Sequence, residues 1–456
     1  MVELITNVNN AVNGFVWGVP MLVLLVGTGI LMTVLTKFFQ LSHLGHWFKN
    51  TVGGIFHDEH VTKHTEAGDQ SISQFQSLCT ALAATIGTGN IVGVASALVA
   101  GGPGAIFWMW VVAFFGMMTN YSENVLGIYY RRRNSKGEWS GGAMYYLKDG
   151  LGSYKGCKQI GAVLAVLFSA FCLLASFGIG NMSQVNSIAA NMTSAFSIPA
   201  TATGIVLVLV GALVIVGAVF TAIFKGAFGL RAVGGGIVGS GVKLALTWGM
   251  KRGVFSNEAG LGSSVMVHSS SNVKEPVRQG MWGIFEVFAD TMVVCTLTAF
   301  AVLSSGLIDL DTGAVLVDVS GSALVGQAFA TVFGSFGPAF IAIAILLFAF
   351  STVLGWSHYG SKAWEYLFGT KSTIVYKIAF VLMIFIGCTM NLGLAWDLSD
   401  TFNGLMAIPN LIGVIALSPV VMKITKNYVA RIIKKEDVKP MLSVFPEIQE
   451  EQEKAM

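Results

Sequence analysis

The chain alternates between long apolar stretches and short polar connections. An α-helix needs roughly 20 mostly apolar residues to cross a bilayer, and ten such stretches occur, at residues 16–36, 78–99, 105–128, 160–179, 200–220, 232–250, 281–303, 339–356, 374–394 and 402–422. The stretch at 232–250 is the weakest, because it is rich in glycine and contains Lys243. The pattern predicts an all-α polytopic membrane protein with a single membrane domain.

The composition supports this prediction. Hydrophobic residues make up 54% of the 456 residues and charged residues only 11%, and the mean hydropathy is +0.70, as in polytopic membrane proteins. The net charge of +3 is small, and the basic residues lie in loops beside apolar stretches, which argues against nucleic-acid binding. The spacing of the five cysteines matches neither a metal site nor a redox pair. Sequence motifs typical of enzymes are also lacking. We therefore expect neither catalysis nor a cofactor.

Two apolar regions are interrupted by glycine and small polar residues. The first interruption lies at residues 87–90 and the second at residues 251–264. Non-helical backbone in a bilayer is tolerated only where it lines a cavity or is buried in protein. Freed amides at the start of a half-helix suit a carboxylate, and freed carbonyls suit sodium. Two such regions in separate halves are typical of inverted-repeat secondary transporters, although glycines also simply allow close helix packing.

Further polar residues inside the spans are candidates for contacts with a ligand. Asn181, Gln184 and Ser187 share one helix face and could meet either a substrate or a neighbouring helix. Ser351 and Thr352 place two hydroxyls in mid-span, where they could bind a cation or bond their own helix carbonyls. Three acidic residues within predicted spans are functional candidates by default: Glu123, Glu286 and Asp290.

The distribution of charge among the loops predicts the orientation. The loop at 131–159 has seven basic and two acidic residues, so we expect it to be cytoplasmic, together with the basic tail after Met422. The loop at 304–327 has three aspartates and no basic residue, so it should be outside, as should the N-terminus. However, four predicted spans separate the two loops, and an even number would put both on one side. Either one of the four does not cross, or a span is missing.

Three segments resemble a known transporter family. Residues 83–90 (AATIGTGN), 101–116 (GGPGAIFWMWVVAFFG) and 253–263 (GVFSNEAGLGS) are similar to motifs of the alanine or glycine:cation symporter family, and the similarity extends to Pro419. The resemblance implies a leucine-transporter-like core of five plus five inverted helices after one extra N-terminal helix. It also implies symport of sodium with alanine or glycine, with these substrate-binding residues: Thr85, Gly87, Thr88, Gly89, Asn90, Gln184, Phe255, Ser256, Asn257 and Trp356.

The resemblance and the two interruptions together suggest alternating access around a site near the membrane midplane. Amides at 87–89 would hold the carboxylate of the amino acid, and oxygens at 255–257 its ammonium group. One sodium ion would bind the carbonyls of Ala83 and Ile86 and the hydroxyls of Ser351 and Thr352. The expected partners are alanine or glycine, sodium and membrane lipid. The alternatives are a proton-coupled porter in which Asp290 or Glu258 titrates, and a paralogue that does not transport.

The chain departs from the family after Val216. Family members have a further helix there, whereas residues 216–225 here lead directly toward the second interruption. About one span of ~20 residues is missing, in the interval where the count of crossings fails. The expected division is an N-terminal helix and cytoplasmic loop (1–74), a first repeat that is one helix short (75–231), a second repeat (232–422) and a cytoplasmic tail (423–456). The oligomeric state stays open.

Overall fold

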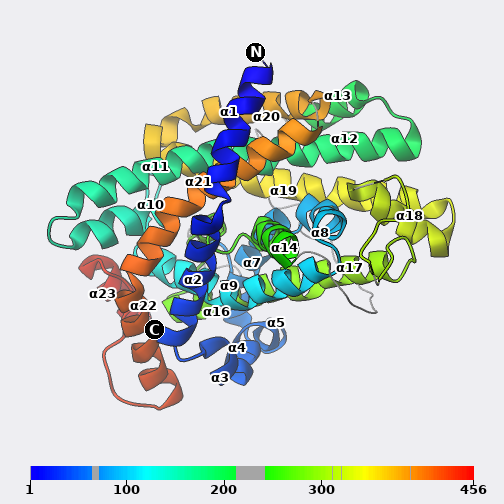
Figure 1. The fold of residues 1–456 in the computed structure, drawn as a ribbon. Helices are drawn as coiled ribbons and strands as arrows, with labels where there is room; N and C mark the ends of the chain where they lie inside the picture. The colour runs from blue at the N-terminus through cyan, green and yellow to red at the C-terminus, as the bar shows by residue number, and fades with distance from the viewer. Residues whose placement is uncertain are drawn as a thin grey trace.

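The structure is a bundle of helices with one short β-hairpin (Figure 1). It is a computed structural model that describes residues 2–63, 71–211, 242–310, 312–319, 321–390 and 392–455. Within these residues, β1 (Arg132–Arg133) pairs with β2 (Trp139–Ser140) in an antiparallel hairpin. The prediction of an all-α polytopic membrane protein is confirmed in its main part, since the hairpin lies in a loop between helices.

The N-terminal helices form a bent pair followed by four short helices. They are α1 (Val2–Val16), α2 (Val19–Leu35), α3 (Phe39–Ser42), α4 (Leu44–Asn50), α5 (Val52–His57) and α6 (Glu59–Thr62). The first two are inclined to each other by 43°. The bend falls at residues 17–18, directly before Pro20, because proline is accepted in the first turn of a helix but not in its interior.

The next part of the chain contains the first interrupted helix and the longest helical run. Its helical elements are α7 (Gln74–Thr85), η1 (Gly89–Gly93), α8 (Val94–Gly101), α9 (Gly104–Tyr129), α10 (Ala143–Tyr145), η2 (Tyr146–Gly150), η3 (Leu151–Ser153), α11 (Lys158–Phe177), η4 (Gly178–Met182), α12 (Ser183–Phe196) and α13 (Ala200–Gly211). Ser73 and Gln76 form a capping box that starts α7, so the backbone amides at this end are satisfied by side chains.

The remainder begins with the second interrupted helix. It comprises α14 (Val242–Asn257), α15 (Val265–His268), α16 (Pro276–Val287), η7 (Phe288–Cys295), α17 (Thr296–Leu303), α18 (Gly321–Phe333), α19 (Phe336–Phe368), η8 (Thr370–Ser372), α20 (Thr373–Thr389), α21 (Leu392–Ala416), α22 (Ser418–Tyr428), η9 (Val429–Ile433) and α23 (Pro446–Lys454). Figure 1 shows α7, α8 and α14 near the centre of the bundle, beside the long helices α9 and α19.

The number of spans depends on how the bent helices are counted. Among the described residues, five helices are long and apolar enough to cross a membrane, and there are eight spans if each of three bent pairs is one span. One of these pairs consists of Gln74–Thr85 and Gly89–Gly101, inclined by 51°. The predicted interruption at residues 87–90 is therefore confirmed as a break in a helix that would otherwise span the membrane.

The predicted limits of the second interruption are wrong. We expected irregular backbone over residues 251–264, but α14 stays helical through Asn257. The backbone leaves the helix at Glu258, which is left-handed with φ 56°, and Gly260 (φ 91°) and Gly262 (φ 71°) follow. Left-handed backbone angles end a helix, whereas Gly253 lies in ordinary helix. The predicted span at 232–250 begins in the structure at Val242, and residues 212–241 lie outside the described part.

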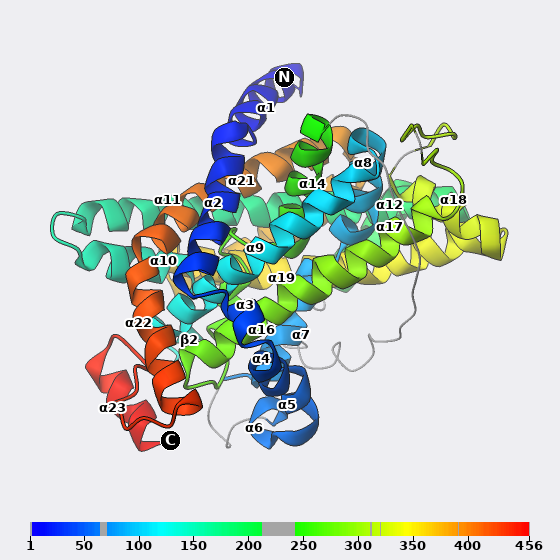
Figure 2. The ribbon, with the colours of Figure 1, turned by 60° about the horizontal axis from the view of Figure 1, so that its bottom comes forward.

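Several loops gather at one end of the molecule. Arg131 in the loop after α9 donates to the carbonyls of Ser269 (3.2 Å) and Ser271 (2.6 Å), next to the end of α15. The C-terminal tail reaches the same place, because Arg133 and Glu451 form an ion pair at 2.8 Å. Figure 2 shows α3 to α6, α22 and α23 at this end and the start of α1 at the other. The loop after α9 and the C-terminal tail therefore lie at the same end of the molecule.

The described helices between the loops at 131–159 and 304–327 are α11, η4, α12, α13, α14, α15, α16, η7 and α17. Residues 212–241, between α13 and α14, lie outside the described part. The number of crossings between the two loops therefore stays a prediction. The fourth predicted span, 200–220, is described only as α13, and its continuation lies outside the described residues.

Candidate functional site

The first break leaves backbone groups outside regular helix at the point where α12, α14 and α19 approach. After α7 ends at Thr85, Ile86 is extended (φ −77°, ψ 96°) and the helix resumes at Gly89. A Cβ on Gly87 would lie 2.4 Å from the Thr352 Oγ1, and one on Gly89 would lie 3.2 Å from the Phe255 ring. Neither glycine has a positive φ. These glycines are therefore required for close approach and not for a left-handed backbone angle.

The amides freed at this break are occupied by side-chain oxygens. The Gly87 N–H donates to the Asn90 Oδ1 at 3.0 Å, and the Thr88 N–H donates to the Gln184 Oε1 at 3.1 Å. The Gln184 Nε2 donates in turn to the Ile179 carbonyl at 2.8 Å, which fixes the direction of the side-chain amide. The predicted carboxylate-binding amides are thus present, and each contacts a predicted substrate residue.

Three of the four predicted sodium ligands lie together. The Thr352 Oγ1 on α19 lies 3.3 Å from the Ala83 carbonyl oxygen and 3.4 Å from that of Ile86, and it donates to the Phe348 carbonyl at 3.1 Å. Oxygen ligands of this kind suit a hard cation. The fourth candidate, Ser351, bonds the Phe348 carbonyl at 2.8 Å, so its hydroxyl is engaged on its own helix.

The second break places Glu258 beside a buried tryptophan. The Glu258 carboxylate accepts hydrogen bonds from the Ser263 Oγ at 2.5 Å and from the Trp356 Nε1 at 2.8 Å. A Cβ on Gly180 would lie 2.2 Å from the Trp356 Cβ, so the π-helical segment η4 packs directly on this side chain. Trp356 is therefore held between the break and η4, by hydrogen bonding on one side and close packing on the other.

A buried aspartate connects the two breaks. The Asp290 Oδ1 accepts from the Asn90 Nδ2 at 2.6 Å, and its Oδ2 accepts from the Ser256 Oγ and the Thr291 Oγ1, each at 2.8 Å. The Asn257 Nδ2 donates to the Thr291 Oγ1 at 3.0 Å. All five side chains are fully buried. Predicted residues from α14 and η1 thus meet around Asp290, whose position inside a span was the sequence signal.

An aromatic and cationic cluster covers the other side of Phe255. Its ring is stacked on Trp396 of α21 with 4.9 Å between centroids, and the Arg252 guanidinium lies 4.8 Å from the Trp396 ring. Asp400 bonds the Lys251 Nζ at 2.7 Å and the Arg252 Nη1 at 3.3 Å. Trp396 and Asp400 were not among the predicted site residues, although an acid in an apolar stretch was a usable signal.

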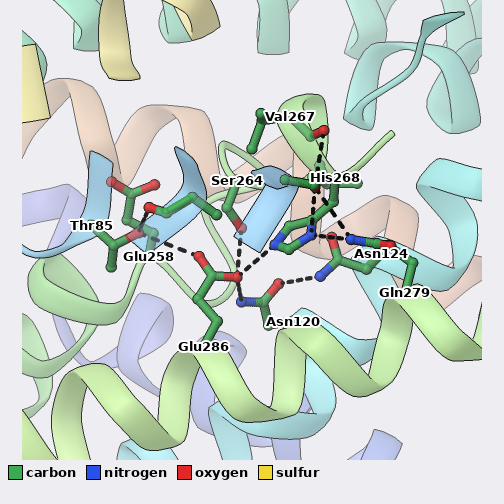
Figure 3. Close-up of polar contacts among 12 residues, drawn as sticks. Thr85, Asn120, Asn124, Glu258, Ser264, Val267, His268, Gln279 and Glu286 are labelled. Atoms are coloured by element: carbon green, nitrogen blue, oxygen red, sulfur yellow. Dashed lines mark hydrogen bonds and ion pairs between the residues drawn. The ribbon is translucent and has the colours of Figure 1, made fainter. Parts of the chain in front are cut away.

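A second buried network lies around Glu286 (Figure 3). Its Oε2 accepts from the Asn120 Nδ2 and from the His268 Nε2, both at 3.0 Å. The Ser264 Oγ lies 3.4 Å from the same oxygen, and the Thr85 Oγ1 lies 3.3 Å from Oε1. This carboxyl therefore joins four helices, α7, α9, α15 and α16.

Comparison with known proteins decides which class of protein carries these breaks. The model of the sodium:alanine symporter family matches residues 2–219 and 216–442. The chain belongs to this family. Its members include the sodium/alanine symporter AgcS of Methanococcus maripaludis, which is 43% identical over 92% of this chain and 96% of its own length. This symporter-family chain is accordingly a multi-pass membrane transporter and not an enzyme.

Two Bacillus subtilis proteins are also similar. The probable sodium/glutamine symporter GlnT is 34% identical over 94% of this chain and 91% of its own length. The amino-acid carrier protein AlsT is 32% identical over 92% of this chain and 91% of its own length. The likeness extends over nearly the whole of each relative, so the comparison concerns the entire transport protein and not one of its segments.

The contact between Gly180 and Trp356 leads to a first prediction. Gly180→Ala is expected to displace the indole, because the added carbon would lie 2.2 Å from the Trp356 Cβ; overpacking of this kind costs about 1–3 kcal/mol. The KM for alanine should rise about tenfold or more while the sodium concentration for half-maximal uptake stays unchanged. Gly27→Ala, with nothing within 4 Å, is the matched control. An unaltered KM in Gly180→Ala would contradict the role of Trp356.

Proposed function

We propose that this protein is a sodium-coupled symporter that carries alanine or glycine into the cell by alternating access. The observation that carries the proposal is the meeting of two interrupted helices at one buried polar centre. A Cβ on Gly89 would lie 3.2 Å from the Ser256 Cα, and Asn90 and Ser256 both donate to Asp290. Interrupted helices paired in this way are typical of substrate and ion sites in secondary transporters. The printed names of AgcS, GlnT and AlsT support the same class of cargo.

The amino acid would bind between the two breaks. Its carboxylate would replace the Asn90 and Gln184 oxygens at the Gly87 and Thr88 amides, where the start of a half-helix favours an anion. Its ammonium group would face the last carbonyls of α14 around Ser256, with the Asp290 carboxylate beside them. The helix end and the carboxylate both favour a cation. A zwitterion would thus satisfy both interrupted helices together.

Sodium would act as the link between α7 and α19. The carbonyls of Ala83 and Ile86 and the hydroxyl of Thr352 already approach one another, and Ser351 would complete the set after a rotation about its χ1. Binding there would hold the end of α7 against α19. The ion would then stabilise this arrangement of the break, so that substrate and ion favour the same closed state.

The proposed architecture is the five-plus-five inverted repeat, with the N-terminus outside and the C-terminus cytoplasmic. Its limits are those expected from the sequence: 1–74, 75–231, 232–422 and 423–456. The two segments matched by the family model, 2–219 and 216–442, meet at the place where we expect one helix to be missing, which supports a first repeat that is one helix short. The absent helix makes impaired transport a specific alternative for this chain.

Uptake by purified protein tests the proposal. Proteoliposomes with an inward sodium gradient should accumulate labelled alanine, and uptake should fall to background when potassium replaces sodium. Accumulation that is driven by a pH gradient without sodium would instead identify a proton-coupled porter, for which Asp290 and Glu258 are the candidate groups. Binding of alanine without exchange of labelled for unlabelled alanine across the membrane would identify the transport-impaired alternative.

A further inference from the structure

The short helices α3 and α4, which follow α2, carry large apolar side chains that the rest of the chain does not cover. Phe38, Leu41, Leu44 and Phe48 are exposed by 45%, 54%, 52% and 47%. Their spacing of three, three and four residues puts them on one side of a helical path, and we call these four side chains the outer face of α3 and α4. An exposed apolar patch of this kind marks an interaction surface.

The opposite side of the same two helices packs against the bundle. Phe39 of α3 is completely buried, with its ring centroid 5.2 Å from that of Tyr121 in α9. Trp47 of α4 is also buried, its ring lies 6.5 Å from that of Phe288 in η7, and its Nε1 donates to the Gln40 carbonyl at 2.9 Å. The segment is therefore fixed on its inner side, and the outer face points away from the protein.

These contacts place α3 and α4 beside membrane spans and not beyond their ends. Tyr121 lies eight residues before the end of α9, and Phe288 lies twelve residues after Pro276, where the span from α16 to α17 begins. At 1.5 Å per residue, these positions are about 12 and 18 Å along the helix axes from the end of the bundle where Arg131 contacts the Ser271 carbonyl. Side chains that point away from the protein at this depth face lipid.

The connection between α2 and α3 is built to stop the preceding span at this level. Lys37 (φ 57°) and Phe38 (φ 55°) are both left-handed, which is unusual for bulky residues and ends a helix. The Phe38 N–H donates to the Thr33 carbonyl at 2.7 Å, and the Lys37 N–H donates to the Val34 carbonyl at 3.0 Å. Val34 is itself 55% exposed, so the apolar outer surface of α2 continues directly into the outer face.

The charges of this segment suit a negatively charged membrane surface. The chain has no acidic residue between Glu3 and Asp58. Lys37 and Lys49 lie at the two ends of the outer face, and both are exposed. Lysines close to a membrane surface are attracted by anionic lipids, and exposed apolar residues flanked by lysine are typical of helices that lie in the interface between lipid and water.

We propose that α3 and α4 form an interfacial anchor that lies in the membrane surface at the end of the molecule where Arg131 lies. The outer face inserts among the lipid chains, and Lys37 and Lys49 contact the headgroups of anionic lipids. Residues 38–50 then belong to the membrane domain, whereas the sequence predicted a cytoplasmic loop up to residue 74. The anchor does not depend on the proposed transport function.

The anchor is connected to the helix that ends at the first break. Val61 of α6 is buried in a cluster with Leu78 and Leu82 of α7 and with Trp282 of α16, and Ile55 of α5 packs against the same cluster. Figure 2 shows α3 to α6 together at this end of the bundle. Through α5 and α6, the anchor therefore fixes the position of α7 relative to the membrane surface.

Nitroxide labels on the outer face test whether it is in contact with lipid. The partly exposed Cys79 and Cys157 are replaced by serine, and a single labelled cysteine replaces Leu41, Leu44 or Phe48 in separate proteins. Each protein is placed in lipid nanodiscs that contain phosphatidylcholine and phosphatidylglycerol. Collisions of the nitroxide with oxygen, which partitions into lipid, are compared with collisions with a neutral nickel complex, which stays in water.

Two further positions provide the matched controls. Val23→Cys lies on the outer surface of α2, where the side chain is 65% exposed, and should report lipid. Lys136→Cys lies at the exposed turn of the β-hairpin and should report water. The three labels on the outer face should resemble Val23→Cys, with loss of most nickel collisions. Nickel accessibility equal to that of Lys136→Cys at all three positions would overturn the proposal, and three independent positions guard against one variant that does not fold.

A change of lipid composition tests the role of the two lysines. With the label at Phe48, nickel accessibility should be lower in nanodiscs with phosphatidylglycerol than in nanodiscs of phosphatidylcholine alone. Lys37→Gln and Lys49→Gln should each raise it by up to about fivefold in the anionic nanodiscs and should have little effect in the neutral ones. Accessibility that does not depend on phosphatidylglycerol would overturn the contact with anionic lipid. None of these measurements requires uptake, so failure of the proposed function would leave their outcome unchanged.

Discussion

Thr352→Val is expected to reduce the apparent sodium affinity of uptake by about 10- to 100-fold. The substitution keeps the shape of the side chain and removes the hydroxyl that lies 3.3 Å from the Ala83 carbonyl oxygen and 3.4 Å from that of Ile86. An interaction between a charged group and a polar ligand contributes about 1.5–3 kcal/mol, which corresponds to this range of affinity. The measurement is the sodium dependence of alanine uptake in proteoliposomes.

Thr352→Ser is the control for this experiment, because serine restores the hydroxyl without the methyl group. It should recover most of the sodium affinity. Alanine binding measured at saturating sodium should be similar in all three proteins, since Thr352 is expected to act through the ion. Identical sodium dependence in Thr352→Val and wild type would remove the case for an ion between α7 and α19.

Asp400→Asn is expected to destabilise the protein by about 3–5 kcal/mol. Asp400 compensates two cations, Lys251 at 2.7 Å and Arg252 at 3.3 Å, and its own side chain is only 1% exposed. Removal of one partner of a buried ion pair leaves uncompensated charge in the interior, which costs this much. The purified variant should unfold at lower temperature or denaturant concentration and should show little uptake.

Two control variants distinguish the loss of charge compensation from a general loss of stability. The double variant Asp400→Asn/Lys251→Met removes one of the uncompensated cations and should recover part of the lost stability. Glu451→Gln breaks the exposed pair with Arg133, and exposed pairs contribute only about 0–1 kcal/mol. If Asp400→Asn lowered the stability no more than Glu451→Gln does, the cluster beside Phe255 would not depend on charge compensation.

The sequence predicted the first break well, because its signals are local. Glycines beside Thr88 and Asn90 inside an apolar stretch mark the place where α7 ends and η1 begins. The second break was predicted at the wrong residues, because that prediction also relied on local signals. Gly253 resembles a helix breaker in the sequence, but the left-handed residues are Glu258, Gly260 and Gly262, and a glutamate in that conformation is not a pattern that can be recognised from sequence.

The contacts between distant segments could not be derived from local patterns. Asp400 and Arg252 are 148 positions apart, and Asn90 and Asp290 are 200 positions apart. Each of these polar residues is visible in the sequence as an exception within apolar surroundings, but its partner depends on how the helices pack. The prediction that intramembrane acids matter was therefore useful, whereas the pairing of His268 with Glu286 required the structure.

The charge pairing of α14 also has a consequence for how the chain enters the membrane during synthesis. Lys251 and Arg252 lie within the described part of α14, Val242–Asn257, and a basic side chain at the centre of an inserting helix costs about 2.5–3.5 kcal/mol. Their counter-charge is on α21, which the ribosome makes roughly 150 residues later. α14 is consequently poorly suited to partition into lipid by itself, and its stable insertion depends on the C-terminal third of the chain being made.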